Sequence, residues 1–62
     1  MKFKVGDVVW CKTGIWVTGT ILAIRPRNKY LIKPHNMFMY PTEIKEKNVE
    51  ECPDEFNPYA DR

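Results

Sequence analysis

Short runs rich in β-branched and aromatic residues, each bounded by Gly, Pro, Asn or Thr, recur along the whole chain. Apolar residues nowhere repeat at the i, i+3, i+4, i+7 spacing of an amphipathic helix for three turns. Such runs are typical of strands separated by tight turns. The pattern predicts strands at residues 7–12, 16–24, 28–34, 37–41 and 47–51. Five short strands form a small barrel or a pair of packed sheets, so the expected fold class is all-β.

The breaks between these runs have the composition of turns. Gly14 supplies the positive φ that a tight connection between the first two strands needs, and Asn28 tolerates the left-handed region in the next turn. Residues 41–44 begin with a proline, which cannot donate a ladder hydrogen bond. They are predicted to form a single helical turn that returns Ile44 to the core.

Successive side chains of a strand point to opposite faces, so the strand positions divide into two sets. The inward set is predicted to be Val9, Cys11, Val17, Gly19, Ile21, Ala23, Tyr30, Ile32, Met37 and Met39. The apolar residues predicted to face outward are Val8, Trp10, Trp16, Leu22, Ile24, Leu31, Phe38 and Tyr40. This is more apolar surface than a small monomer normally leaves in water, so we expect part of it to be covered.

The chain has 62 residues, which suffices for one domain with a thin core. Residues 1–52 are predicted to form the domain. Residues 53–62 contain two prolines and three acidic residues and lack any periodicity, so they are predicted to be a flexible acidic tail. Phe56 and Tyr59 are the residues of this tail that could attach it to the domain.

The cysteines and the histidine bear on metal sites and on the cellular compartment. Cys11, Cys52 and His35 are scattered without C-x-x-C spacing, so neither a metal site nor a cofactor is expected. A disulfide between the cysteines requires the first strand and the C-terminal end to lie side by side, and two free thiols in a reducing cytosol are the alternative. No run approaches the roughly 18 apolar residues of a membrane span, so a cytoplasmic protein without a membrane partner is expected.

Charge is distributed unevenly although the net charge is only +2. Residues 1–47 carry nine basic and three acidic residues, whereas residues 48–62 carry one basic and five acidic residues. A basic body followed by an acidic tail indicates either a polyanionic partner for the body or a tail that folds onto it.

Two groups of residues are candidates for contact with such a partner. Cations on a turn stiffened by proline could bind phosphates, and the alternative is a solvated turn. These candidate cations are Arg25, Arg27, Lys29 and Lys33. Exposed aromatic residues could stack on bases, hold a methylated lysine or anchor a peptide, and the alternative is that they close the barrel ends or a self-association face. These candidate aromatic residues are Trp10, Trp16, Phe38 and Tyr40.

Candidate catalytic groups lack identifiable partners in the sequence. His35 lies between Pro34 and Asn36, and no nucleophile or carboxylate can be assigned to it, so it is interpreted as a surface turn residue. The two thiols have no identifiable activating base and are interpreted as structural. The residues therefore favour a protein that is not an enzyme.

Several short motifs resemble those of SH3-like barrels over about residues 5–51. They are Gly6-Asp7-x-Val9, Lys12-Thr13-Gly14, Gly19-x-Ile21, Tyr30 and Tyr40-Pro41. Within that group their spacing is similar to the type II dihydrofolate reductases, which assemble as tetramers around a pore lined by a Val-Gln-Ile-Tyr stretch. The matching stretch here is Met37-Phe38-Met39-Tyr40, and Cys11 stands where the family has a functional lysine.

A second resemblance is to Tudor and KOW-type modules, which share this barrel and bind methylated peptides, RNA or components of the transcription machinery. The stretch Gly14-x-Trp16-x-x-Gly19-x-Ile21 is similar to the first Tudor hairpin, where an aromatic residue at the place of Trp16 helps to form the methyl-ligand cage. This resemblance implies a binding module, although fold similarity alone does not transfer function.

The sequence thus predicts a small five-stranded SH3-like barrel with a flexible acidic C-terminal tail. The hypothesis for its function is a small non-enzymatic module that binds nucleic acid or a protein complex that handles nucleic acid. The alternatives are an adaptor that docks a protein or a second copy of itself through its apolar face, and an enzyme related to the type II reductases.

Overall fold

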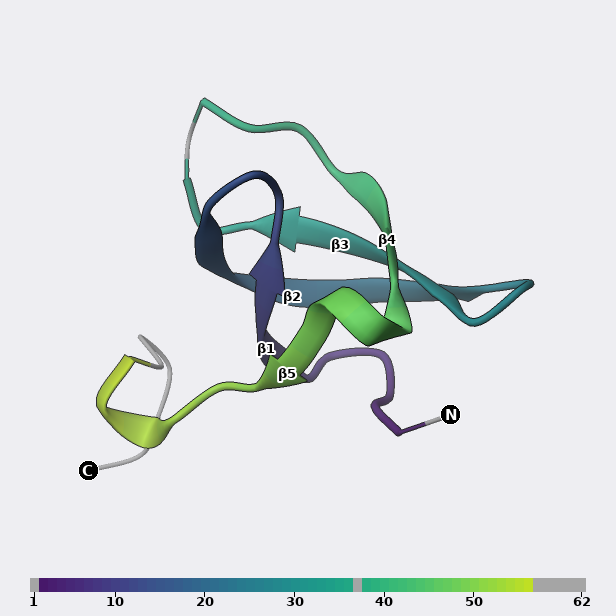
Figure 1. Ribbon diagram of the computed structural model, residues 1–62, viewed down its shortest axis with the longest axis horizontal. Coiled ribbons are helices and arrows are strands. Elements are labelled where there is room, and N and C mark those ends of the chain that lie inside the picture. Colours follow the sequence, from purple (N-terminus) through teal and green to yellow (C-terminus); the bar gives the residue numbers. More distant parts are fainter. Residues whose placement is uncertain (1, 37, 57–62) are drawn as a thin grey trace.

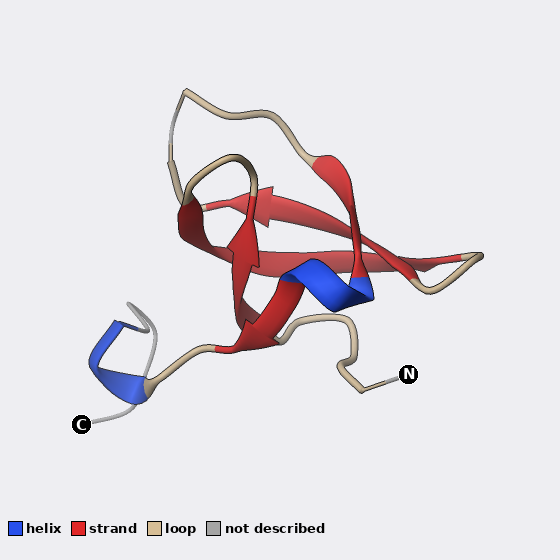
Figure 2. Ribbon diagram, viewed as in Figure 1, coloured by secondary structure: helices blue, strands red, loops and turns tan. Residues whose placement is uncertain are grey.

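The structure is a computed structural model that describes residues 2–36 and 38–56 (Figure 1). Five antiparallel strands form a single sheet. They are β1 (Val8–Lys12), β2 (Trp16–Arg25), β3 (Lys29–Pro34), β4 (Thr42–Lys45) and β5 (Val49–Glu51). Short 3₁₀ turns follow the last two strands, η1 (Glu46–Asn48) after β4 and η2 (Asp54–Phe56) after β5. Figure 2 shows how far strands dominate the described chain, so the all-β prediction is confirmed.

The strand order in the sheet is β4-β3-β2-β1-β5. The two edge strands, β4 and β5, follow one another in the chain and are joined by η1, and β1 and β4 cross the long β2–β3 hairpin steeply (Figure 1). Among the described residues no ladder pairs β4 with β5. The sheet therefore bends in the manner of a small barrel and remains open along one seam.

A small core lies on the inner face of this bent sheet. Side chains from all five strands meet there, and Phe3 and Val17 pack against its margin. Its buried members are Val9, Cys11, Ile21, Tyr30, Ile32, Ile44 and Val49. Alternation predicted that the buried residues of β1 and β3, and Ile21 of β2, point inward, and this is confirmed.

An irregularity in β2 interrupts this alternation. Ile21 pairs with Ile32, whereas Ala23 already pairs with Leu31, so Leu22 is an extra residue in the ladder. Such a bulge bends the strand and shifts which residues share a face beyond it. Ile24 consequently lies opposite Tyr30, an inward residue, although its own side chain is 42% exposed.

The predicted fourth strand at residues 37–41 is wrong, and so is the helical turn predicted at residues 41–44. The strand is β4, at Thr42–Lys45, and the helical turn is η1, which follows it. The amide groups of Phe38 and Met39 bond to Asn36 and form a turn instead of a ladder. Ile44 enters the core as predicted, but from a strand in which it lies opposite Tyr30. Met37 is outside the described residues.

The N-terminal segment covers one end of the core. The amide of Gly6 donates to the carbonyl of Ile21, and the amide of Ile21 donates to the carbonyl of Asp7, at 2.8 and 3.0 Å. Phe3 packs edge-on against Tyr30 with ring centroids 5.9 Å apart, and its amide donates to the Tyr30 hydroxyl. Backbone and side-chain hydrogen bonds thus attach the segment before β1 to both strands of the long hairpin.

Both cysteines are free thiols, so the pair is not a disulfide. Cys11 belongs to the core, and its burial raises the pKa of the thiol to about 11. Burial, with a smaller contribution from Asp54, also raises the pKa of Cys52. Because the thiolate is the nucleophilic form of cysteine, the raised pKa values disfavour reaction of both thiols at neutral pH.

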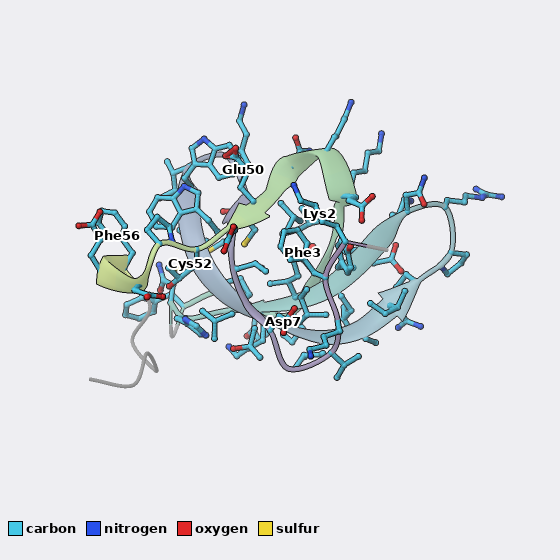
Figure 3. The ribbon with its side chains drawn as sticks, turned by 90° about the horizontal axis from the view of Figure 1, so that it is seen from below. Lys2, Phe3, Asp7, Glu50, Cys52 and Phe56 are labelled. Atoms are coloured by element: carbon cyan, nitrogen blue, oxygen red, sulfur yellow. The ribbon has the colours of Figure 1, made fainter. Side chains whose placement is uncertain are left out.

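The described part of the C-terminal segment returns to the sheet. Residues 54–56 form η2, and the ring of Phe56 packs against that of Trp10 at a centroid distance of 5.2 Å. Figure 3 shows Phe56 at one end of the molecule. Phe56 thus attaches this segment to β1, as the sequence suggested, whereas residues 57–62, with Tyr59, lie outside the described residues.

Candidate nucleic-acid interface

The β2–β3 hairpin ends in a turn at residues 26–28 that carries part of the predicted cation set. Arg27 and Asn28 have φ values of 65° and 57°, so both lie in the left-handed region. The prediction that Asn28 adopts the left-handed region is confirmed, and Arg27 at the tip adopts it as well. Arg25 and Lys29 lie opposite each other where the two strands enter the turn.

A carboxylate on the neighbouring strand offsets two of these cations. Glu43 of β4 approaches Arg25 Nε through Oε2 at 3.5 Å and Lys29 Nζ through Oε1 at 4.0 Å. The partners are a third to a half exposed, so solvent screens each pair and its contribution to stability is small. The main consequence is electrostatic, because the positive field of this part of the hairpin is reduced.

Lys33 has a structural contact. Its Nζ donates to the carbonyl of Met39 at 2.9 Å, which ties the loop between β3 and β4 to β3. Of the predicted cations, Arg27 lines a hollow at the surface beside η1, where Lys2, Lys45 and Lys47 lie together with Glu46 and Glu50. The structure therefore divides the predicted cation set between ion pairs, a loop contact and the open hairpin tip.

A second hollow beside η1, of similar size, gathers cations that were not among the predicted ones. We call it the basic groove, an open hollow of about 610 Å³ lined by the end of β1, the loop before β4, β4 itself and η1. Lys12, Lys45 and Lys47 line it, with Glu43 as its one carboxylate among the described residues. Glu43 is also the residue that Arg25 and Lys29 approach. The groove therefore carries an excess of positive charge.

The four predicted aromatic residues do not form one cluster. Among the described residues the ring contacts are Phe3–Tyr30 and Trp10–Phe56. Tyr40, 87% exposed, lines the basic groove, and Trp16 lies opposite Lys12 at the end of the β1–β2 ladder. Tyr40 and Trp16 are therefore the aromatic residues that accompany the groove lysines.

The remaining two aromatic residues lie elsewhere. Trp10 lies opposite Glu50 in the β1–β5 ladder, so its surroundings are acidic as well as aromatic. Glu50 and Phe56 are both on the C-terminal side of the molecule in Figure 3. Phe38, 84% exposed, is on the same loop as Tyr40 and does not line the groove.

Two positions bear on the resemblance to the type II reductases. Cys11, which stands where that family has a functional lysine, is fully buried in the core. Residues 38–40, which match part of the pore-lining stretch, lie on an exposed loop and not in a strand. This chain therefore presents neither feature in the way the resemblance implied.

His35 is half-buried and tethers the end of β3 to β2. Its Nε2 is hydrogen-bonded to Thr20 Oγ1 at 2.7 Å and its Nδ1 to Thr18 Oγ1 at 3.0 Å. Its backbone amide donates to the carbonyl of Thr18 at 2.9 Å. These contacts give His35 a structural role at the turn predicted for it.

The fold is expected to lose stability in mild acid through His35. Desolvation, together with the positive charge of Lys33, lowers the pKa of His35 below its ordinary value of 6.5. The unfolded chain therefore binds this proton at a higher pH than the folded one, so the contribution is complete above pH 6.5 and falls away as the pH drops toward the folded pKa. The urea midpoint of unfolding should be lower at about pH 5.5 than at about pH 7.5, and His35→Gln should reduce that difference. An equal difference in both proteins would contradict this role.

Other kinds of site were sought in the same residues. Within residues 2–36 and 38–56 no three His, Cys, Asp or Glu side chains lie close enough together to hold a metal ion. No helix in that part of the chain is long and apolar enough to cross a membrane. Comparison of the chain with protein-family models, with curated proteins and with solved structures found no match.

Proposed function

We propose that this protein is a small non-enzymatic module, an SH3-like barrel, that binds nucleic acid directly or as part of a complex that handles nucleic acid. The observation that carries this proposal is the convergence of Lys12, Lys45 and Lys47 around one open groove. The single described carboxylate of the groove already has two cationic neighbours outside the set of three. Three ammonium groups around one carboxylate leave a local excess of positive charge, which favours binding of a phosphate backbone.

The predicted cations and aromatic residues have graded roles in this proposal. Arg27 and Lys2 add two cations across η1, in a hollow that shares Lys45 and Lys47 with the basic groove and also contains Glu46 and Glu50. Arg25 and Lys29 contribute less, since Glu43 offsets them, and Lys33 acts by holding the loop. Tyr40 and Trp16 supply the nearest aromatic surface, whereas Trp10 and Phe38 lie at its margin or beyond.

Replacement of the three groove lysines is expected to weaken binding and to reduce its salt dependence. Each phosphate contact contributes about 0.7 to 0.9 to the slope of log affinity against log salt concentration. The triple variant Lys12→Gln/Lys45→Gln/Lys47→Gln should therefore lower that slope by about 2 and weaken binding by roughly tenfold or more at low salt. Fluorescence anisotropy with a labelled oligonucleotide, titrated from about 50 to about 200 mM salt, measures both quantities.

Lys4→Gln is the control, because Lys4 is exposed and does not line the groove. It should change the affinity by less than any one groove lysine does. Affinity that is independent of salt in the unchanged protein would refute the proposal. An equal loss per charge in the control and in the groove variants would show a diffuse attraction and no site.

A second candidate function is an adaptor that docks a protein or a second copy of itself. Exposed apolar side chains favour it, since Ile15 is 70% exposed and Leu22 and Ile24 on β2 are 44% and 42% exposed. A self-associating face predicts a mass that rises with concentration. Sedimentation of the protein at several concentrations, without any oligonucleotide, separates this candidate from the first.

A further inference from the structure

The geometry points to single-stranded nucleic acid as the ligand of the basic groove, with one base stacked on Tyr40. This inference rests on the proposed function and deepens it by naming the form of nucleic acid. It depends on where Tyr40 lies, how its loop is held and which cations surround it.

Tyr40 presents nearly its whole side chain to solvent beside the cations. It is 87% exposed and lines the same hollow as Lys12, Lys45 and Lys47. An aromatic ring left in water forgoes its large gain from burial, unless a partner covers it. A ring at the margin of a cationic groove matches a ligand that carries flat apolar faces and phosphates together.

The loop that carries Tyr40 is attached on both sides of Met39. The amide of Phe38 donates to Asn36 Oδ1 at 2.9 Å, and the amide of Met39 donates to the carbonyl of Asn36 at 3.0 Å. The carbonyl of Met39 accepts from Lys33 Nζ, and Pro41, directly after Tyr40, has a fixed φ. Ligand binding therefore needs little further ordering of the backbone beneath the ring, which favours affinity.

The exposed ring of Tyr40 among the cations favours a single strand over a duplex. Lys12 lies on the β1 side of the groove, and Lys45 and Lys47 lie on the β4 and η1 side. A strand that runs between them brings its phosphates to both sides while a base turns toward Tyr40. In a duplex the base faces are already stacked on one another, so the ring gains nothing and phosphate contacts alone remain.

The test compares one sequence in two forms. Anisotropy is measured with a labelled single strand of about ten nucleotides without self-complementarity, as RNA and as DNA, and with the same strand annealed to its complement. We expect the unchanged protein to bind the single strand about tenfold more tightly than the duplex. Tyr40→Leu should weaken binding of the single strand about five- to tenfold and leave binding of the duplex unchanged, because stacking is lost and every lysine is kept.

Phe38→Leu is the matched control. Phe38 is as exposed as Tyr40 and lies on the same loop, but it does not line the groove, so its replacement should change either affinity by less than about twofold. Far-ultraviolet circular dichroism and a melting curve for each variant exclude loss of the fold. These side chains are exposed, so both variants should melt like the unchanged protein.

The outcomes separate this inference from the proposed function. Failure of both forms to bind overturns the proposed function and the inference together. Equal binding of single strand and duplex, with neither affected by Tyr40→Leu, overturns the inference and leaves the proposed function in place. Equal losses for Tyr40→Leu and Phe38→Leu would also overturn it, because the loop as a whole and not a stacked ring would then be responsible.

Discussion

Gly19→Ala is expected to destabilise the fold by about 2 to 3 kcal/mol, the upper part of the roughly 1 to 3 kcal/mol usual when a packed core must accept an extra group. A Cβ at this position would lie 2.6 Å from Ile32 Cγ2, 3.1 Å from the carbonyl oxygen of Lys33 and 3.3 Å from Pro34 Cα. Two of these atoms are backbone, and Ile32 is fully buried, so the strands must separate to make room. Glycine is required here for the close approach of β3 to β2.

The size of the chain makes this loss large. At the usual 0.05 to 0.15 kcal/mol per residue, a chain of 62 residues has a free energy of unfolding of roughly 3 to 9 kcal/mol. Urea unfolding followed by tryptophan fluorescence measures the change. Glu50→Ala on exposed β5 is the control and should change stability by less than about 0.5 kcal/mol. If the Gly19→Ala protein were as stable as the original, β2 and β3 would be able to separate at little cost and the prediction would be wrong.

Tyr30→Phe is expected to lower the free energy of unfolding by about 2 kcal/mol, because the Tyr30 hydroxyl joins three parts of the fold. This hydroxyl accepts from the amide of Phe3 at 3.1 Å and donates to the Glu46 carboxylate, which also accepts from the amide of Lys2. Removing the oxygen leaves the Phe3 amide without its acceptor beside a buried ring. The phenylalanine keeps the packing of the ring, so the loss reports on the hydrogen bonds alone, and urea unfolding measures it.

The pH dependence of stability tests the same hydrogen bonds independently of the change measured at neutral pH. The hydrogen bond from Tyr30, then that from the Lys2 amide, lowers the pKa of Glu46 below its ordinary value of 4.5. The folded state therefore favours the carboxylate, and this stabilisation is complete above pH 4.5 and disappears as the pH falls through the lowered pKa. Tyr30→Phe should lose less stability than the unchanged protein over that acid range.

Glu46→Gln is the companion variant. Its amide oxygen can still accept from Tyr30 and Lys2, so it should cost less than Tyr30→Phe at neutral pH and should remove the acid dependence that Glu46 contributes. If Glu46→Gln lowered the free energy of unfolding more than Tyr30→Phe does, the charge of the carboxylate and not the tyrosine hydroxyl would be the main source of the stabilisation.

The limits of sequence reasoning are clearest in the third and fourth strands. Alternation along the chain predicted that Tyr30 and Ile32 point inward. This prediction is confirmed because β3 is regular and has one face in the core. Residues 38–41 have equally strong strand composition but do not form a strand. The amide groups of Phe38 and Met39 bond to Asn36, and the carbonyl of Met39 accepts from Lys33, contacts that composition does not encode.

The candidate site was only partly predictable for a related reason. Arg25 and Lys29 form an obvious basic cluster in the sequence, yet Glu43, which offsets them, comes from a strand that was assigned to the wrong residues. Lys12 is distant in sequence from Lys45 and Lys47, so nothing local indicates that they share a groove. Tyr40 was selected as an exposed aromatic residue, but its place beside these lysines was not foreseen.

By itself, the sequence determined the all-β class, the inward face of β1 and β3 and the turns at Gly14 and Asn28, because these follow from side-chain alternation and local backbone preferences. The tertiary structure decided which cations are offset, which line the basic groove, and which aromatic ring accompanies them. These are contacts between residues far apart in the chain, and their energies depend on distances that only the folded sheet sets.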